Sequence, residues 1–308
     1  GSGRTTAVRQ FLDQRAAERP APPEWCYVYN FDDARRPRAI SVPPGRATTL
    51  RRAMEGLVQQ LRVEIPRAFE GQPFEEKRRE LILSLQQKQQ TLFQNLDAYL
   101  KARGFALIRS ESGLAIAPIG ADGEVLSAEA YQKLSPEDRK RYEAYRAELQ
   151  SEFDQAMREA RELDRQGKRA LESITSELAS FVVDGLVSEV REQFLDCPKV
   201  LAYLDAVRQD VVSNVQQFLP SPEENVPFAL RNMGDGTRWF SRYAVNVLAE
   251  TAECSCAPVV IEDNPTYPNL VGRIEHRAEF GTMVTDFTQI RAGALHRANG
   301  GYLVVEAK

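Results

Sequence analysis

The sequence is poor in the residues that mark several classes of protein. It has only two histidines and four cysteines among 308 residues. So few cysteines in a chain of this length argue against a disulfide-stapled scaffold and favour a reducing compartment. No apolar run approaches the roughly 20 residues that cross a bilayer, and the start lacks the basic-then-apolar pattern of a secretory signal. We therefore expect a soluble, cytoplasmic protein with no membrane partner.

An excess of positive charge is also lacking. The formal net charge is −4, and basic residues such as Arg35 and Arg36 are interspersed with acidic ones such as Asp32 and Asp33. A nucleic-acid partner is therefore not expected. What the chain does have is 43% hydrophobic and 27% charged residues, which is enough for a sizeable core and, by length, for about two domains.

The final residues, 293–308, end in an apolar run that meets an acid. The run occupies residues 302–305 after a glycine pair, and Glu306 follows it. Such a run is typical of a buried parallel strand, and the residue at its carboxyl end lies where α/β folds place ligands. The alternative is an ordinary strand that ends in a polar residue for solubility.

The first residues complement this strand. They read Gly1-Ser2-Gly3-Arg4-Thr5-Thr6 before a helical pattern, which resembles the second half of a phosphate-binding loop. Arg4 occupies the lysine position, and its planar fork cannot reproduce a compact ammonium. We expect Gly3, Arg4, Thr5 and Glu306 to mark a degenerate nucleotide-binding site.

The chain between these ends changes character twice. We expect the first part of an α/β core in residues 1–64, a helical insertion in 65–225, and the second part of the core in 226–308. The first part has a β-prone run at 25–31, then a helix with Leu50, Met54 and Leu57 on one face, capped by Thr48 or Thr49. Helix, strand and helix in that order suit a wound sheet.

The insertion is dominated by helical periodicity. Ile82, Leu85, Leu92 and Leu96 form an apolar stripe in a helix at about 75–103, and runs at 105–108 and 114–118 predict a β-hairpin. A helix of roughly 55 to 60 residues starts near Ser135, with Gly167 as its expected kink or weak point, and residues 200–219 predict a third helix. We expect an antiparallel, coiled-coil-like hairpin; the alternative is a compact bundle.

A longer stretch carries a family resemblance. Residues 264–307 read NPTYPNLVGRIEHRAEFGTMVTDFTQIRAGALHRANGGYLVVEA and resemble the bacterial Lon-related protease group, including its ATP-independent Lon-like C branch. The resemblance implies a mostly α fold with an α/β part, in which a partial AAA+-like core is interrupted by the helical insertion. It also implies a Ser-Lys protease domain beyond Lys308, because no serine and lysine in this chain match that motif.

The resemblance further implies partners and contact residues. Modules of this kind assemble into six-membered rings, and aromatic residues on loops grip unfolded polypeptide in the central pore. Tyr267 and Phe280 are the candidates here, with core packing as the alternative for both. Arg273 serves either a subunit interface or, as we prefer, a surface salt bridge. Cys254-Ser255-Cys256 with His276 and His296 is a weaker candidate for a metal site, because its spacing is too short for zinc.

Departures from the family pattern limit the expected chemistry. A working Walker B strand ends in Asp-Glu, whereas this chain has Glu306 and then Ala307, which has no group to orient water. We expect no catalytic residue, no metal, and at most weak binding of ATP and Mg²⁺. The preferred function is substrate recognition, gating and assembly in a Lon-like protease. The alternatives are an active ATP-driven unfoldase and a coiled-coil scaffold ATPase.

Overall fold

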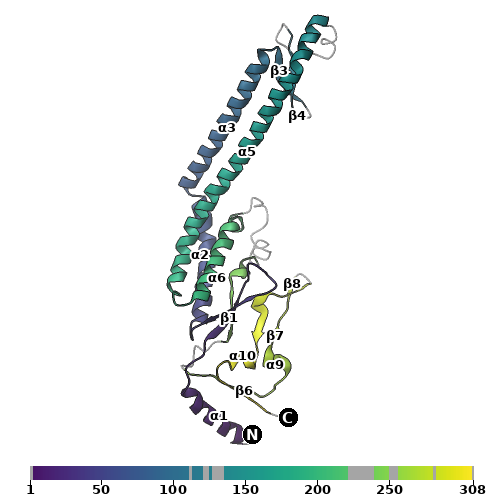
Figure 1. The fold of residues 1–308 in the computed structure, drawn as a ribbon. Helices are drawn as coiled ribbons and strands as arrows, with labels where there is room; N and C mark the ends of the chain where they lie inside the picture. Colours follow the sequence, from purple (N-terminus) through teal and green to yellow (C-terminus); the bar gives the residue numbers. More distant parts are fainter. Residues whose placement is uncertain are drawn as a thin grey trace. The chain divides into compact units, whose positions relative to one another are not determined.

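The computed structural model is mostly helical, with several small sheets (Figure 1). This confirms the mostly α fold with an α/β part. The chain forms two compact units, the first made of Gly1–Phe69 with Leu178–Lys308 and the second of Glu70–Glu177. The structure describes residues 3–110, 113–120, 125–126, 135–220, 239–249, 256–279 and 282–306.

An antiparallel sheet of order β2-β1-β5 lies in the first unit. Its strands are β1 (Glu24–Val28), β2 (Arg38–Val42) and β5 (Val245–Ala249). The β-prone run at 25–31 does form a strand, but the expected wound sheet is wrong for this part of the chain. The link between β1 and β2 is too short for the helical crossover that parallel strands need, so the two strands form a hairpin instead.

Helix α2 (Ala47–Phe69) follows β2 and buries the predicted apolar face against the first unit's core. It begins before the predicted caps, Thr48 and Thr49. The backbone N–H of Ala47 donates instead to Oε2 of Glu24, at 2.8 Å. The predicted caps are therefore wrong, because a carboxylate from a neighbouring strand satisfies the free N–H group at the helix start.

Two further helices complete the helical layer of the first unit. Ala179, Val183 and Val187 are buried on the last part of α5 (Pro136–Glu192), and an Arg208–Asp184 ion pair joins this part to α6 (Pro198–Ser213). Helix α6 confirms the predicted third helix in this part of the chain. It clusters with the first unit, whereas the sequence analysis placed it in the insertion.

The second unit consists of α3 (Gln72–Lys101), the part of α5 up to Glu177, and a β-hairpin (Figure 1). The two helices form an antiparallel pair. Gln89 donates to Asp164 at 2.6 Å and Tyr99 to Glu148 at 2.6 Å. Moving forward along α3 therefore means moving backward along α5, as in an antiparallel pair. Strands β3 (Phe105–Ser110) and β4 (Gly113–Pro118) pair as predicted. The core of this unit contains Leu96, Leu100, Phe105, Leu149 and Ala156.

Helix α5 is 57 residues long and continuous through Gly167. The helix is thus not interrupted at the predicted kink or weak point. A Cβ atom at Gly167 would lie 2.5 Å from Cδ1 of Leu85, so the glycine makes room for a close approach of α3. Tertiary packing thus explains a residue that helix propensity alone marks as a weak point.

The last part of the chain is made of short elements around a parallel strand pair. Strand β11 (Tyr302–Val305) pairs in parallel with β6 (Val259–Glu262), which confirms the predicted strands and their parallel direction. The expected burial is wrong, because Tyr302, Leu303 and Val304 are half-buried and Val305 is 46% exposed. Among the described strands, β11 pairs with β6 alone.

The remaining elements are short. Four strands of this part form two small antiparallel ladders, β7 with β10 and β8 with β9. The elements are η1 (Val215–Gln217), η2 (Ser241–Tyr243), α9 (Tyr267–Val271), β7 (Gly272–Ile274), β8 (Arg277–Glu279), β9 (Thr282–Val284), η3 (Phe287–Gln289), β10 (Ile290–Ala292) and α10 (Ala294–Arg297). None of the described helices combines the length and the apolar character that a bilayer crossing needs.

Candidate functional site

The predicted phosphate-loop residues lie at the start of α1 (Gly3–Ala17). Gly3 is exposed and Thr5 is half-buried, and the side chain of Arg4 lies outside the part of the chain that the structure describes. The other end of the helix is joined to the segment that enters β6. The carbonyl of Arg19 accepts from the N–H of Ala257 at 3.2 Å. Helix α1 is therefore held beside the parallel strand pair.

Glu306 follows β11 directly and is exposed to solvent. A second glutamate ends the neighbouring strand, because Glu262 is in register with Val305. The Glu262 side chain is 13% exposed, and its carboxylate accepts from the N–H of Asn264 at 3.1 Å and from Arg297 at 3.3 Å. The two parallel strands thus end in one acid that is paired and another that faces solvent.

Glu262 and Arg297 were not among the predicted site residues. Glu262 follows the apolar run of β6 in the way that Glu306 follows β11, so the same sequence pattern was available for both. Arg297 had no such signal, because its role depends on α10 placing its guanidinium beside β6. The pair neutralises the half-buried carboxylate of Glu262, whereas no cation among the described residues pairs with Glu306 at the end of β11.

Tyr267 lies on the segment that leaves the carboxyl end of β6. It is the first residue of α9 and is 75% exposed, so the core-packing alternative is wrong for this residue. Phe280, the other residue predicted to contact polypeptide, lies outside the described residues. Helix α9 ends at Gly272, whose φ of +102° favours glycine. A Cβ atom at Gly293 would lie 2.2 Å from the carbonyl oxygen of Leu270, so two glycines let α9 and α10 pack closely.

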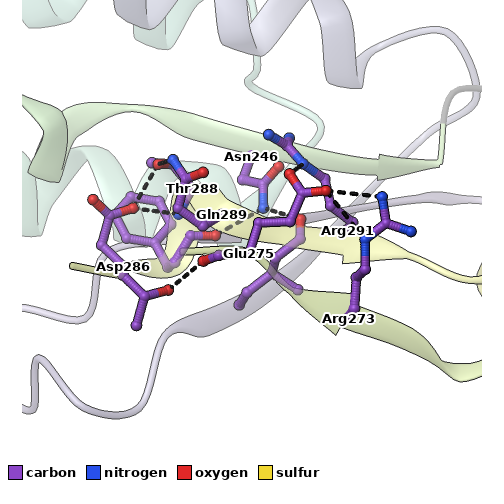
Figure 2. A network of polar contacts seen from close by, with 10 residues as sticks. Asn246, Arg273, Glu275, Asp286, Thr288, Gln289 and Arg291 are labelled. Atoms are coloured by element: carbon purple, nitrogen blue, oxygen red, sulfur yellow. Dashed lines mark hydrogen bonds and ion pairs between the residues drawn. The ribbon is translucent and has the colours of Figure 1, made fainter. Parts of the chain in front are cut away.

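Beside this segment, Glu275 is held between two arginines (Figure 2). Nε of Arg291 donates to Oε2 at 2.7 Å, and Nε and Nη2 of Arg273 donate to Oε1 at 3.1 and 2.9 Å. Arg291 and then Arg273 hold the pKa of the Glu275 carboxyl below its ordinary value. The predicted surface salt bridge of Arg273 is confirmed.

The network continues to the antiparallel sheet of the first unit (Figure 2). Nδ2 of Asn246 in β5 donates to the carbonyls of Phe287 and Ile290, at 2.8 and 2.9 Å. Asp286 caps η3 by accepting from the N–H of Thr288 at 2.8 Å. These bonds connect the segment around Tyr267 and Glu275 to β5, so that the exposed tyrosine is carried by a connected scaffold.

The remaining predicted candidates do not come together. His276 is exposed, and Nδ1 of the exposed His296 accepts from the N–H of Gly293 at 3.4 Å in a local cap. Cys256 is half-buried, and Cys254 lies outside the described residues. Over the part of the chain that is described, no group of three or more histidine, cysteine, aspartate or glutamate side chains is placed to hold a metal. Burial and, to a smaller extent, the charge of Glu24 raise the pKa of the Cys26 thiol to about 12.

Comparison with known families adds two independent matches. Residues 255–308 match a family described as the LonB-like AAA domain. This range holds the parallel strand pair, Tyr267 and the Glu275 network. Residues 24–57 match a family described as the Lon-like LonC helical domain, and they cover β1, β2 and the first half of α2. A search among curated proteins finds no match.

The first match makes the last part of the described chain similar to the LonB-like AAA domain. With the second match, it supports a Lon-like protease family for this chain. The chain is therefore similar, in two separate segments of its first compact unit, to components of Lon-like proteases.

Proposed function

We propose that this chain is the substrate-recognition, gating and assembly module of a Lon-like serine protease that degrades unfolded polypeptides. In this proposal the first unit is an AAA+-like core and the second a coiled-coil-like insertion. The protease domain lies in another part of the full-length protein, which works as a cytoplasmic homo-hexamer without a nucleic-acid or membrane partner. The observation that carries the proposal is the position of Tyr267 within the segment that matches the LonB-like AAA domain.

Tyr267 has the properties of a residue that contacts polypeptide. Its ring is 75% exposed at the start of a five-residue helix, next to a proline that stiffens the backbone. An exposed aromatic on a stiff support loses little conformational entropy when it contacts a chain. The hydrogen bonds that link this region to β5 give the support against which a polypeptide can be held.

The first experiment replaces Tyr267 in the full-length protein. Tyr267→Ala is expected to slow degradation of an unfolded protein by about fivefold to tenfold, because truncating an aromatic anchor typically costs more than about 1 kcal/mol. Cleavage of a short fluorogenic peptide should stay at the parent rate, since a short peptide needs no grip. Phe280→Ala is expected to act in the same way.

The matched control for Tyr267→Ala is Phe181→Ala. Phe181 is an aromatic that is 80% exposed, on α5. Its replacement removes a similar apolar surface and should leave degradation of the unfolded protein unchanged. An equal loss of activity on the unfolded protein and on the short peptide in Tyr267→Ala would contradict the gripping role.

Nucleotide chemistry has a small part in this proposal. Arg4 stands at the lysine position of the loop, Glu306 at the first carboxylate position, and Ala307 at the position that orients water. The second candidate, an ATP-driven unfoldase, draws its support from the parallel pair β6–β11 with α1 beside it. In that case Arg4 and Glu306 still hold Mg-ATP.

Titration calorimetry of the chain with ATP and Mg²⁺ separates the two candidates. The gating proposal expects a dissociation constant of about 1 mM or weaker, because two parts of the site are altered. Saturable binding that is much tighter, and that is lost in Arg4→Ala but kept in Arg9→Ala, would favour the unfoldase. Arg9 is a suitable control, because it lies on the same helix and pairs with Asp13 at 3.9 Å.

A further inference from the structure

A groove runs along one side of the helical pair in the second unit. Its cavity measures about 270 Å³ and lies between α3 and α5. The residues that line it are three or four positions apart on each helix, so each helix presents a single face to the groove. They include Leu92, Leu96 and Tyr99 of α3 and Glu152, Ala156 and Glu159 of α5.

The floor of the groove is apolar. Leu96 and Ala156 are 5% and 6% exposed and belong to the core of the second unit, and Leu92 is half-buried beside them. The side chain of Ala156 ends at Cβ, so α5 leaves space opposite the leucines of α3. A floor of this kind suits an aliphatic chain, such as the methylene groups of lysine or arginine.

The edge of the groove on α5 is acidic. Glu152 and Glu159 are exposed, and no basic residue lines the cavity. Oε1 of Glu159 accepts from Gln155 at 3.0 Å. Among the residues that the structure describes, no cation bonds to either carboxylate. The groove therefore combines an apolar floor with two negative charges at its edge, which complements a cationic side chain with an aliphatic stem.

The neighbouring turn of α5 shows this combination with a cation in place. Glu148 lies four residues before Glu152, and its Oε1 accepts from Nη2 of Arg103 at 3.1 Å and from the hydroxyl of Tyr99 at 2.6 Å. The guanidinium carbon of Arg103 lies 3.7 Å from the centre of the Tyr99 ring. An arginine of the chain thus pairs with Glu148. Glu152 lies one turn further along α5, beside the groove, and no cation within the described part of the chain pairs with it.

We propose that this groove binds a lysine or arginine side chain of a polypeptide segment. The aliphatic stem lies on Leu92 and Leu96, and the cation lies at Glu152 and Glu159. The cavity is at the lower end of the size range of small-molecule pockets, so it takes one long side chain rather than a folded partner. The proposal rests on the proposed function only in taking polypeptide as the ligand, and it gives the second unit a preference for basic, amphipathic segments.

The test measures binding of two labelled peptides to the whole chain by fluorescence anisotropy. In the first peptide lysine, leucine and serine alternate, and in the second glutamate replaces each lysine. The lysine peptide is expected to bind more tightly, and its affinity should fall as salt screens the exposed carboxylates. Glu152→Gln with Glu159→Gln should weaken its binding about fivefold, because two exposed ion pairs are lost while the side-chain shapes are kept.

The matched control is Glu143→Gln with Glu172→Gln. Both residues are exposed on α5, and neither lines the cavity. This double variant makes the same change in net charge and should bind the lysine peptide like the parent chain. Equal binding of both peptides, or equal weakening by the two double variants, would overturn the proposal.

A third variant fills the cavity above the apolar floor. Ala156→Leu should weaken binding of the lysine peptide by occupying the cavity, with helix content checked by circular dichroism. If overpacking unfolds the helical pair, the glutamine variants still decide the question. A free diamine that bound as tightly as the peptide would overturn the polypeptide assignment. Self-association that was abolished by the Glu152 and Glu159 changes would assign the groove to a second copy of the chain and would also overturn it.

The outcomes are distinguishable from those for Tyr267. One pattern supports the groove proposal and contradicts the gripping role of Tyr267: the glutamine variants weaken peptide binding, while Tyr267→Ala degrades unfolded protein at the parent rate. The reverse pattern removes the groove and leaves the proposed function in place. Peptide binding needs no protease activity, so a failure of degradation does not affect this test.

Discussion

Glu24 is a charged side chain in the core of the first unit, where it is 2% exposed. Its Oε2 accepts the N–H of Ala47 at 2.8 Å, and this hydrogen bond joins β1 to the start of α2. A buried carboxylate that caps a helix is favourable because the helix start carries partial positive charge and free N–H groups. The Glu24 side chain therefore links the central strand of the sheet to the first turn of α2.

Replacing Glu24 should lower the stability of the first unit. Glu24→Ala is expected to cost about 2 kcal/mol, because it removes a helix cap and leaves a buried N–H without its acceptor. Glu24→Gln keeps an acceptor oxygen and should cost less. Urea unfolding measures both. If the alanine and glutamine variants unfold at the same urea concentration, the capping role is wrong.

Single residues of the candidate site were predictable to different degrees. Glu306 was predictable, because an apolar run that ends in an acid is visible in the sequence. The exposure of Tyr267 was not, since an aromatic between two prolines is compatible with a core or a surface position. Arg297 was not predictable either, because its partner Glu262 is distant in sequence and meets it only through the packing of α10 on β6.

At the scale of whole elements, helices were easier to predict than strands. The long apolar stripes of α3 and α5 fixed their existence, their approximate bounds and their antiparallel pairing. Strand β2 was missed, because its five residues lie between prolines and begin with an exposed arginine and alanine. Such a short strand is defined by its partner β1 more than by its own residues.

The role of an interior glycine also had to come from the structure. Gly167 in α5 was expected to weaken the helix, since glycine has a low helix propensity. In the folded chain it faces Leu85, whose Cδ1 would have to shift to admit a Cβ atom at this position. A glycine that weakens a helix and a glycine that admits a neighbouring side chain look the same in the sequence, because both lie among helix-forming residues.

At the scale of the whole molecule, the chain forms two units with separate cores. The second unit is one continuous stretch, and its core residues Leu96, Leu100 and Leu149 all lie within Glu70–Glu177. The first unit is discontinuous, because β1 pairs with β2 on one side and with β5 on the other. The predicted segments 1–64, 65–225 and 226–308 stay a prediction, and α6 shows where their boundaries differ from the compact units.

This organisation predicts how fragments behave. A fragment of residues 70–177 is expected to be helical and to unfold cooperatively, because its core and its β-hairpin are complete. A fragment of residues 1–69 should not fold, because it lacks β5 and α6. Circular dichroism during thermal unfolding measures both. A cooperative transition in the shorter fragment, or none in the longer, would contradict this division.

The central position of β1 also matters while the chain is being made. Strand β1 can pair with β2 soon after synthesis, but its other edge stays open until β5 has been made, which requires the whole second unit to come first. Long-range pairing of this kind slows folding, and an open edge can pair with other chains in the meantime. Because the first unit is interrupted, the risk that a newly made chain pairs with another chain depends on how long the edge of β1 stays unoccupied.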